Sequence, residues 1–152
     1  MQQSHIGIAA LVGAAFLAFS TTAGTQVIVS GNDEKVLWDE AGQAVFSPPG
    51  KDTITFIDTA DRENPKILTS IALQNSIFGP PTNLAVTPNG ELALVANSVT
   101  QTRDGDKWKP VPDNKVYILD LKANPPKQIG TVEVGKQPSG LDVSKKGGPR
   151  PA

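Results

Sequence analysis

Short segments in which apolar and polar residues alternate follow one another along most of the chain. In Thr53–Asp58, for example, Ile54 and Phe56 fall on one face of an extended strand, while Thr55 and Ile57 fall on the other. Segments of this kind, bounded by Gly, Pro, Asn and Asp, are typical of short antiparallel strands. The pattern predicts the strands Gln26–Ser30, Thr53–Asp58, Ile67–Leu73, Asn83–Thr87, Leu92–Asn97, Lys115–Leu121, Gln128–Val134 and Gly140–Ser144.

The strand pattern occurs twice, about 60 residues apart. TITFID at 53–58 corresponds to KVYILD at 115–120, and PTNLAVTPNG at 81–90 corresponds to PSGLDVSKKG at 138–147. A repeat of about 40–50 residues, made of short strands alone, is typical of a β-propeller blade. The longer spacing here requires inserted loops.

Blade strands are lettered A to D from the innermost to the outermost, and the predicted strands then follow in the order B-C-D, A-B-C-D, A. Asp58 and Asp120 end the two C strands. Because Asp accepts hydrogen bonds from nearby backbone N–H groups, its recurrence there predicts a turn-capping role.

The chain resembles the YVTN-type β-propeller repeat proteins, which include YncE-like and lactonase-fold exported proteins. The resemblance lies in Pro81–Gly90, Leu94–Asn97, Asn114–Asp120, Thr131–Gly135 and Pro138–Ser144. It implies an all-β fold of about two four-stranded antiparallel blades from a propeller of about seven, so residues 25–147 are a partial propeller. We therefore expect an N-terminal fragment that needs further blades or self-association to close a ring. The alternative is a short protein that assembles with copies of itself.

The first 24 residues predict a signal peptide. An apolar run from Ile6 to Phe19 is followed by small residues up to Gly24, and this run is shorter than the roughly 20 residues that span a bilayer. We expect a signal helix that is cleaved, no membrane span afterwards, and a periplasmic or secreted protein. An uncleaved anchor or a buried helix is the alternative. Residues 148–152 are expected to be a disordered tail.

Removal of this segment would leave a chain with neither histidine nor cysteine, because His5 is the single histidine and there are no cysteines. Such a chain cannot form a Ser-His-Asp triad, a Cys-His pair or a His-ligated zinc site. Acid–base chemistry would fall to Asp, Glu, Lys or Tyr117, so the prediction leans away from an enzyme and includes no cofactor. A net charge of −1 gives no reason to expect a nucleic-acid partner.

Three loops are expected on one face of the propeller: Gly31–Asp52 and Val99–Asn114, which each join strands B and C, and Gln74–Pro81, which joins D and A. Long loops on a rigid scaffold are common binding surfaces. We expect this face to bind a protein, a glycan or a small ligand. Its candidate residues are Trp38, Asp39, Asn75, Phe78, Trp108, Lys109 and Gln137.

Several alternatives stay open on this face. The two tryptophans could be lids that pack over their own blades, Asp104-Gly-Asp106 bears a slight likeness to a calcium loop, and Asp33-Glu34 is more typical of a solvated loop than of a catalytic pair. The resemblance also allows part of a lactonase-like or quinone-linked enzyme whose site would need the missing blades.

Overall fold

The structure, a computed structural model, describes residues 26–76 and 83–145. These residues form antiparallel sheets and contain no helix, which confirms the all-β prediction. The predicted signal peptide and the tail at 148–152 lie outside the described residues. The strands are β1 (Val27–Asn32), β2 (Val36–Trp38), β3 (Ala44–Phe46), β4 (Thr53–Asp58), β5 (Lys66–Ala72), β6 (Leu84–Val86), β7 (Leu92–Asp104), β8 (Lys107–Asp120) and β9 (Lys127–Glu133).

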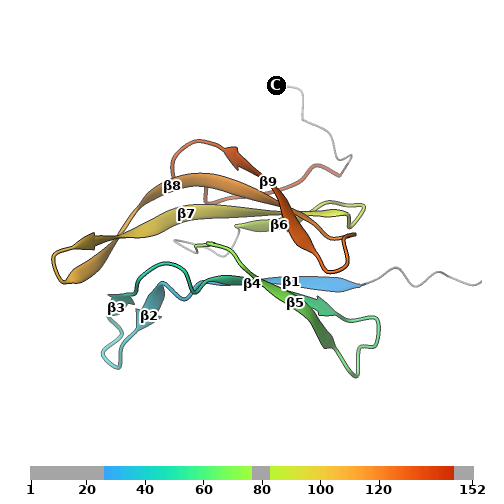
Figure 1. The fold of residues 1–152 in the computed structure, drawn as a ribbon, viewed down its shortest axis with the longest axis horizontal. Coiled ribbons are helices and arrows are strands. Elements are labelled where there is room, and N and C mark those ends of the chain that lie inside the picture. The colour runs from blue at the N-terminus through green and yellow to red at the C-terminus, as the bar shows by residue number, and fades with distance from the viewer. Residues whose placement is uncertain (1–25, 77–82, 146–152) are drawn as a thin grey trace, which may run out of the picture.

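Two main sheets lie in two layers (Figure 1). The first sheet has the order β1-β4-β5, and the second has the order β6-β7-β8-β9. These orders match the predicted B-C-D and A-B-C-D arrangements. The hairpin β2–β3 forms a separate two-stranded sheet and lies at the same end of the molecule as the turn that joins β7 to β8 (Figure 1).

The sequence repeat is also a repeat of hydrogen-bond register. In the first sheet the pairing of β4 with β5 shifts between Phe56 and Ile57, and in the second the pairing of β8 with β9 shifts between Ile118 and Leu119, at the equivalent position. The backbone bonds recur as well: the Leu73 N–H donates to the Asp52 carbonyl at 3.1 Å, and the Val134 N–H to the Asn114 carbonyl at 2.8 Å. The two sheets are therefore two copies of one structural unit.

Equivalent positions of the two sheets face the same way. Phe56 points from the first sheet into the core shared with the second, where it meets Leu119. Its equivalent, Ile118, precedes Leu119 on β8, and successive residues of a strand point to opposite faces. Ile118 therefore lies on the side of the second sheet that faces away from the first. The two units are stacked in one direction, like neighbours in a repeat array.

The core lies between the sheets. Ile54, Phe56 and Leu73 of the first unit pack against Ala93, Val95 and Leu119 of the second, and these six side chains are at most 7% exposed. Burial of apolar surface is the main favourable contribution to folding. Because half of the core comes from each sheet, neither sheet is complete without the other.

Three predictions of local structure were wrong. Residues 99–114 were expected to be a loop, but β7 and β8 continue through them as a two-stranded ribbon that turns at Gly105, where φ is +61°. Within the expected loop 31–52, residues 36–46 form the β2–β3 hairpin. Gly140–Ser144 was expected to be a strand, yet it has no strand structure. A strand needs a neighbour for its backbone groups, and within the described chain β6 already occupies the free edge of β7.

The predicted capping role of the two aspartates is confirmed. Asp58 Oδ1 accepts the Ala60 N–H at 2.9 Å, and Asp120 Oδ1 accepts the Lys122 N–H at 2.9 Å. Asp58 thus closes the turn after β4, and Asp120 closes the equivalent turn after β8.

Candidate functional site

A buried ion cluster anchors the β2–β3 hairpin to the first sheet. Lys35 is fully buried, and its Nζ donates to the carboxylate of Asp52 and to the carbonyl of Asn75 at 3.0 Å. Asp33 Oδ1 lies 3.2 Å from the same Nζ. A buried cation is tolerated when partners replace its water shell. These contacts hold the start of the hairpin in one position.

Asn75, a predicted ligand-binding residue, belongs to the same cluster and is fully buried. Its Nδ2 lies within hydrogen-bond distance of the carbonyls of Asn32, Thr53 and Leu73, at 3.1–3.3 Å. A Cβ added to Gly31 would lie 2.9 Å from its Oδ1. The side chain therefore joins β1, β4 and the segment that follows β5 from within, which is a structural role.

A second cluster lies at the matching end of the second sheet, with Asn97 and Asp113 buried and the Lys115 side chain 41% exposed. Asn97 Nδ2 donates to Asp113 Oδ2 at 2.7 Å, and Lys115 Nζ lies 3.1 Å from Asp113 Oδ1. Burial pushes the pKa of Asp113 up, but hydrogen bonds from the Asn114 N–H, Asn97 and Lys115 outweigh it, so the pKa is lowered. Burial raises the pKa of the nearby Tyr117, so this phenol stays protonated at neutral pH and is poorly suited to act as a base.

The β2–β3 hairpin presents apolar side chains to solvent. Trp38 is 73% exposed, and Leu37 and Val45, which are paired across the hairpin, are 54% and 45% exposed. Leu37 and Val45 project from one face of the hairpin, and Trp38, which is paired with Ala44, projects from the other. Large exposed apolar groups of this kind mark interaction surfaces. We call Leu37, Trp38 and Val45 the hairpin patch. Trp38 is not a lid packed over its own sheet.

Asp39 forms the turn of this hairpin. Its Oδ1 accepts the N–H groups of Ala41 at 2.9 Å and Gln43 at 2.7 Å, and Gly42 has a φ of +72°. An Asp that bonds to the backbone N–H two residues further on is a common turn device. Its carboxylate is thus engaged within the hairpin, next to the hairpin patch.

The tip of the β7–β8 ribbon carries two more predicted residues. The guanidinium of Arg103 lies 5.9 Å from the ring centroid of Trp108, a cation–π distance, and these residues are paired across the ribbon. Lys109 Nζ donates to Asp104 Oδ2 at 2.9 Å. Asp104, the first carboxylate of the calcium-like sequence, therefore has a cation beside it.

The remaining predicted residues fall into two groups. Gln137 has a left-handed φ of 55°, and its N–H donates to the Asp113 carbonyl at 2.8 Å, so it fixes the chain leaving the second sheet. Phe78 lies outside the described residues. The structure thus brings Trp38 and Asp39 together on one hairpin and places Trp108 and Lys109 on a neighbouring ribbon, whose strand β8 is in contact with β3.

Sequence reasoning missed Lys35 and misjudged Asp33. Asp33 was expected in a solvated loop, but its side chain is 8% exposed and faces Lys35. The available signal for a hairpin was a pair of short apolar runs, 36–38 and 44–46, separated by a segment with Asp39 and Gly42. Nothing in the pattern marks Lys35 as buried, because burial there depends on Asp52 and Asn75, which are distant in sequence.

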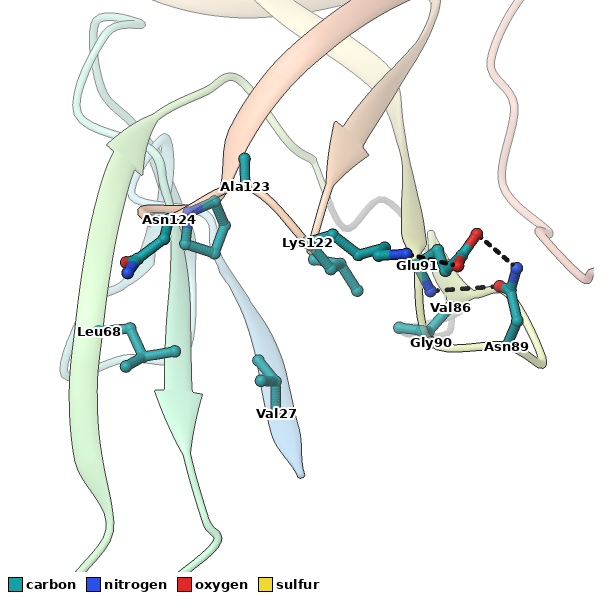
Figure 2. Close-up of a pocket in the computed structure, with 11 residues that line it drawn as sticks. Val27, Leu68, Val86, Asn89, Gly90, Glu91, Lys122, Ala123 and Asn124 are labelled. Atoms are coloured by element: carbon teal, nitrogen blue, oxygen red, sulfur yellow. Dashed lines mark hydrogen bonds and ion pairs between the residues drawn. The ribbon is translucent and has the colours of Figure 1, made fainter. Parts of the chain in front are cut away.

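A groove of about 700 Å³ opens between the two sheets at the other end of the molecule. Figure 2 shows Val27 and Leu68 of the first sheet on one side of it, with Glu91 and Lys122 of the second on the other. Lys122 Nζ donates to Glu91 Oε1 at 3.0 Å, and this bond raises the pKa of Lys122. The ligand face expected from the sequence lies at the opposite end.

Comparisons with known proteins found no matching family model, no similar curated protein and no similar solved structure. Over residues 26–76 and 83–145, no three His, Cys, Asp or Glu side chains are grouped to hold a metal ion. The same part of the chain contains no helix long and apolar enough to cross a membrane.

Proposed function

We propose that this chain is an exported binding module built from two β-propeller-type blades, and that it binds a protein partner through the hairpin patch. The stacking of two equivalent sheets in one direction supports the blade assignment, since propeller blades are radially repeated four-stranded sheets. The predicted signal segment supports export to the periplasm or cell exterior.

The observation that carries the binding proposal is an exposed patch on a rigid base. Trp38 is 73% exposed, yet the hairpin that bears it begins at the fully buried Lys35. Tryptophan is enriched among the residues that dominate binding energy, and a base that is already ordered lowers the entropic cost of binding. A hairpin with exposed apolar side chains on both faces is better suited to contact a protein than a polar sugar.

The proposal can be tested by placing a photo-reactive amino acid at position 38 or, as a control, at position 68. Leu68 is also exposed but lies beside the groove at the far end of the molecule. In the native host, light should join position 38 to a defined partner protein and leave position 68 without that product. The partner, once identified, should bind the Trp38→Ser variant at least about tenfold more weakly.

Two results would contradict the proposal. One is an equal set of products from positions 38 and 68, which would indicate random collision. The other is binding of glycans by the purified chain on an array, with the signal lost in Trp38→Ser, which would assign the patch to sugar stacking.

Amino-terminal sequencing of the protein from the host tests export, which predicts a mature chain that starts near residue 24.

A further inference from the structure

We infer that the chain associates head to tail with a second copy of itself. The first sheet of the second copy stacks on the outer face of the second sheet of the first copy. It also pairs with residues 141–143 of the first copy, which form an added edge strand. This inference rests on the repeat and is independent of what the hairpin patch binds. The interface within one chain serves as the template for the interface between copies.

The two exposed sheet faces match the two faces that are already packed together. In the first sheet, Ile71 and Leu73 face the second sheet, and Leu73 is 7% exposed. Their equivalents in the second sheet are Val132 and Val134, which are 47% and 40% exposed. The outer face of the second sheet thus carries apolar residues at the positions that are buried in the first sheet. We expect this face to be buried against another unit.

The opposite face shows the same relation. Ala93 and Leu119 of the second sheet are fully buried against the first. Their equivalents are Ile28, which is 53% exposed, and the half-buried Ile57. The outer face of the first sheet therefore corresponds to the surface that receives a preceding unit. One chain carries both halves of the contact, which is the arrangement that produces heterologous assembly.

The edges of the sheets agree with the faces. In the second sheet β6 pairs with β7 in the register Leu84–Val95, Ala85–Leu94 and Val86–Ala93. In the first sheet β1, the equivalent of β7, has β4 as its neighbour in the described chain and no counterpart of β6. The sequence PSGLDVS at 138–144 repeats the sequence PTNLAVT that contains β6. Free sheet edges readily accept a strand from another chain.

The repeat gives the register of the added strand. Transfer of the β6–β7 pairs to the equivalent residues places Leu141 opposite Ser30, Asp142 opposite Val29 and Val143 opposite Ile28. Residues 141–143 leave the second sheet at a fixed point, because Ser98 Oγ donates to the Pro138 carbonyl at 2.5 Å. They therefore begin where a following unit would lie.

The grooves agree with this arrangement. The groove between the sheets is lined on the second-sheet side by residues that include Glu91, Leu121 and Pro126. A smaller hollow of about 500 Å³ on the outer face of the first sheet is lined by their equivalents, Gln26, Thr59 and Pro65. The smaller hollow thus corresponds to the second-sheet side of the larger groove. In the assembly, the second sheet of another copy would form the opposite side.

Disulfide trapping tests the register, because the chain contains no cysteine. Ser30→Cys and Leu141→Cys are made in separate chains, one of them ¹⁵N-labelled, then mixed and oxidised. Each chain then carries one thiol, so a mixed disulfide forms only between copies. The expected result is a mixed Ser30–Leu141 disulfide in clear excess over either homodisulfide.

Ser70→Cys replaces Ser30→Cys in the matched control. Ser70 pairs with Thr55, as Ser30 does, but from the far strand β5. It would lie about 14 Å from the added strand, which is beyond the reach of a disulfide. A mixed disulfide at Ser70 as abundant as at Ser30 would overturn the inferred register.

Sedimentation of the unmodified chain tests the association itself. The mean mass should rise with protein concentration. Val132→Glu, which places a charge on the outer face of the second sheet, should weaken association by about tenfold or more. Gln43→Glu, which adds a charge at an exposed position outside both sheets and outside the hairpin patch, should leave it unchanged. A monomer at every concentration, or an oligomer insensitive to Val132→Glu, would overturn the inference.

Discussion

At the scale of single residues, the structure uses buried charges as anchors. Lys35 and Asp113 each lie at the base of an inserted hairpin, where backbone groups and opposite charges replace the water they lose. A buried ion pair often adds little net stability, but removal of one partner is costly. The value of these clusters therefore lies in fixing the direction of the hairpins.

Asp113→Asn should reduce stability in a way that depends on pH. The pKa of Asp113 is lowered from its ordinary value of 3.8, so its contribution is fully present above that value and is lost as the pH falls toward the lowered pKa. We expect the variant to be about 1–3 kcal/mol less stable at pH 7. The difference should shrink as the pH falls below 3.8. Urea unfolding at several pH values measures it, and a constant difference would contradict the assignment.

At the scale of elements, the sequence predicted strands well where one face is apolar. The bounds predicted for β4 were correct because Ile54 and Phe56 alternate with Thr53 and Thr55. The ribbon formed by β7 and β8 was missed because its outer part carries Arg103, Lys107 and two prolines. Pro110 and Pro112 are two residues apart, so the two positions that lack an N–H donor lie on the same edge of β8. A ribbon with a free outer edge tolerates this arrangement.

The segment 140–144 shows the other limit of sequence reasoning. Its residues repeat those of β6 in sequence, yet the strand predicted from that repeat is not formed. β6 forms because β7 lies beside it, and that partner is not encoded by the segment itself. The buried position of Lys35 has the same explanation, since Asp52 and Asn75 reach it only through the fold.

The β2–β3 hairpin should behave as an independent element. Asp39→Ala removes the acceptor for the Ala41 and Gln43 N–H groups, which should cost about 1 kcal/mol locally. Amide protection should fall for residues 36–46 and stay unchanged in both sheets, and the melting temperature should barely move. Glu40→Ala, at an exposed neighbouring position, is the control. Loss of protection in β4 would show that the hairpin and the sheet unfold together.

At the scale of the whole molecule, the repeat in the sequence predicted the strand order of both sheets, but not which faces would be covered. Which faces are buried depends on how the two sheets stack. Each unit has one face for the unit before it and one for the unit after it, and within this chain the inward pair of faces is satisfied while the outward pair is partly exposed. Stability is then shared between units and their interface, as in other repeat arrays.

Two identical substitutions separate the inward face from the outward face. Ile54→Ala removes a fully buried side chain between the sheets, and should cost about 2–5 kcal/mol. It should also lower amide protection in β7 and β8, because both sheets share that core. Ile118→Ala, on the outward face and half-buried, should cost about 1 kcal/mol in dilute solution.

The stability costs of Ile54→Ala and Ile118→Ala should converge as protein concentration rises. If copies stack as inferred, the outward face of the second sheet becomes buried in the assembly, and Ile118 then occupies the place that its equivalent, Phe56, has in the same core as Ile54. Stability gained through association depends on concentration. Unfolding measured across a hundredfold range of concentration should therefore show a rising cost for Ile118→Ala and a constant cost for Ile54→Ala. Parallel behaviour of the two variants would mean that the outward face stays in water.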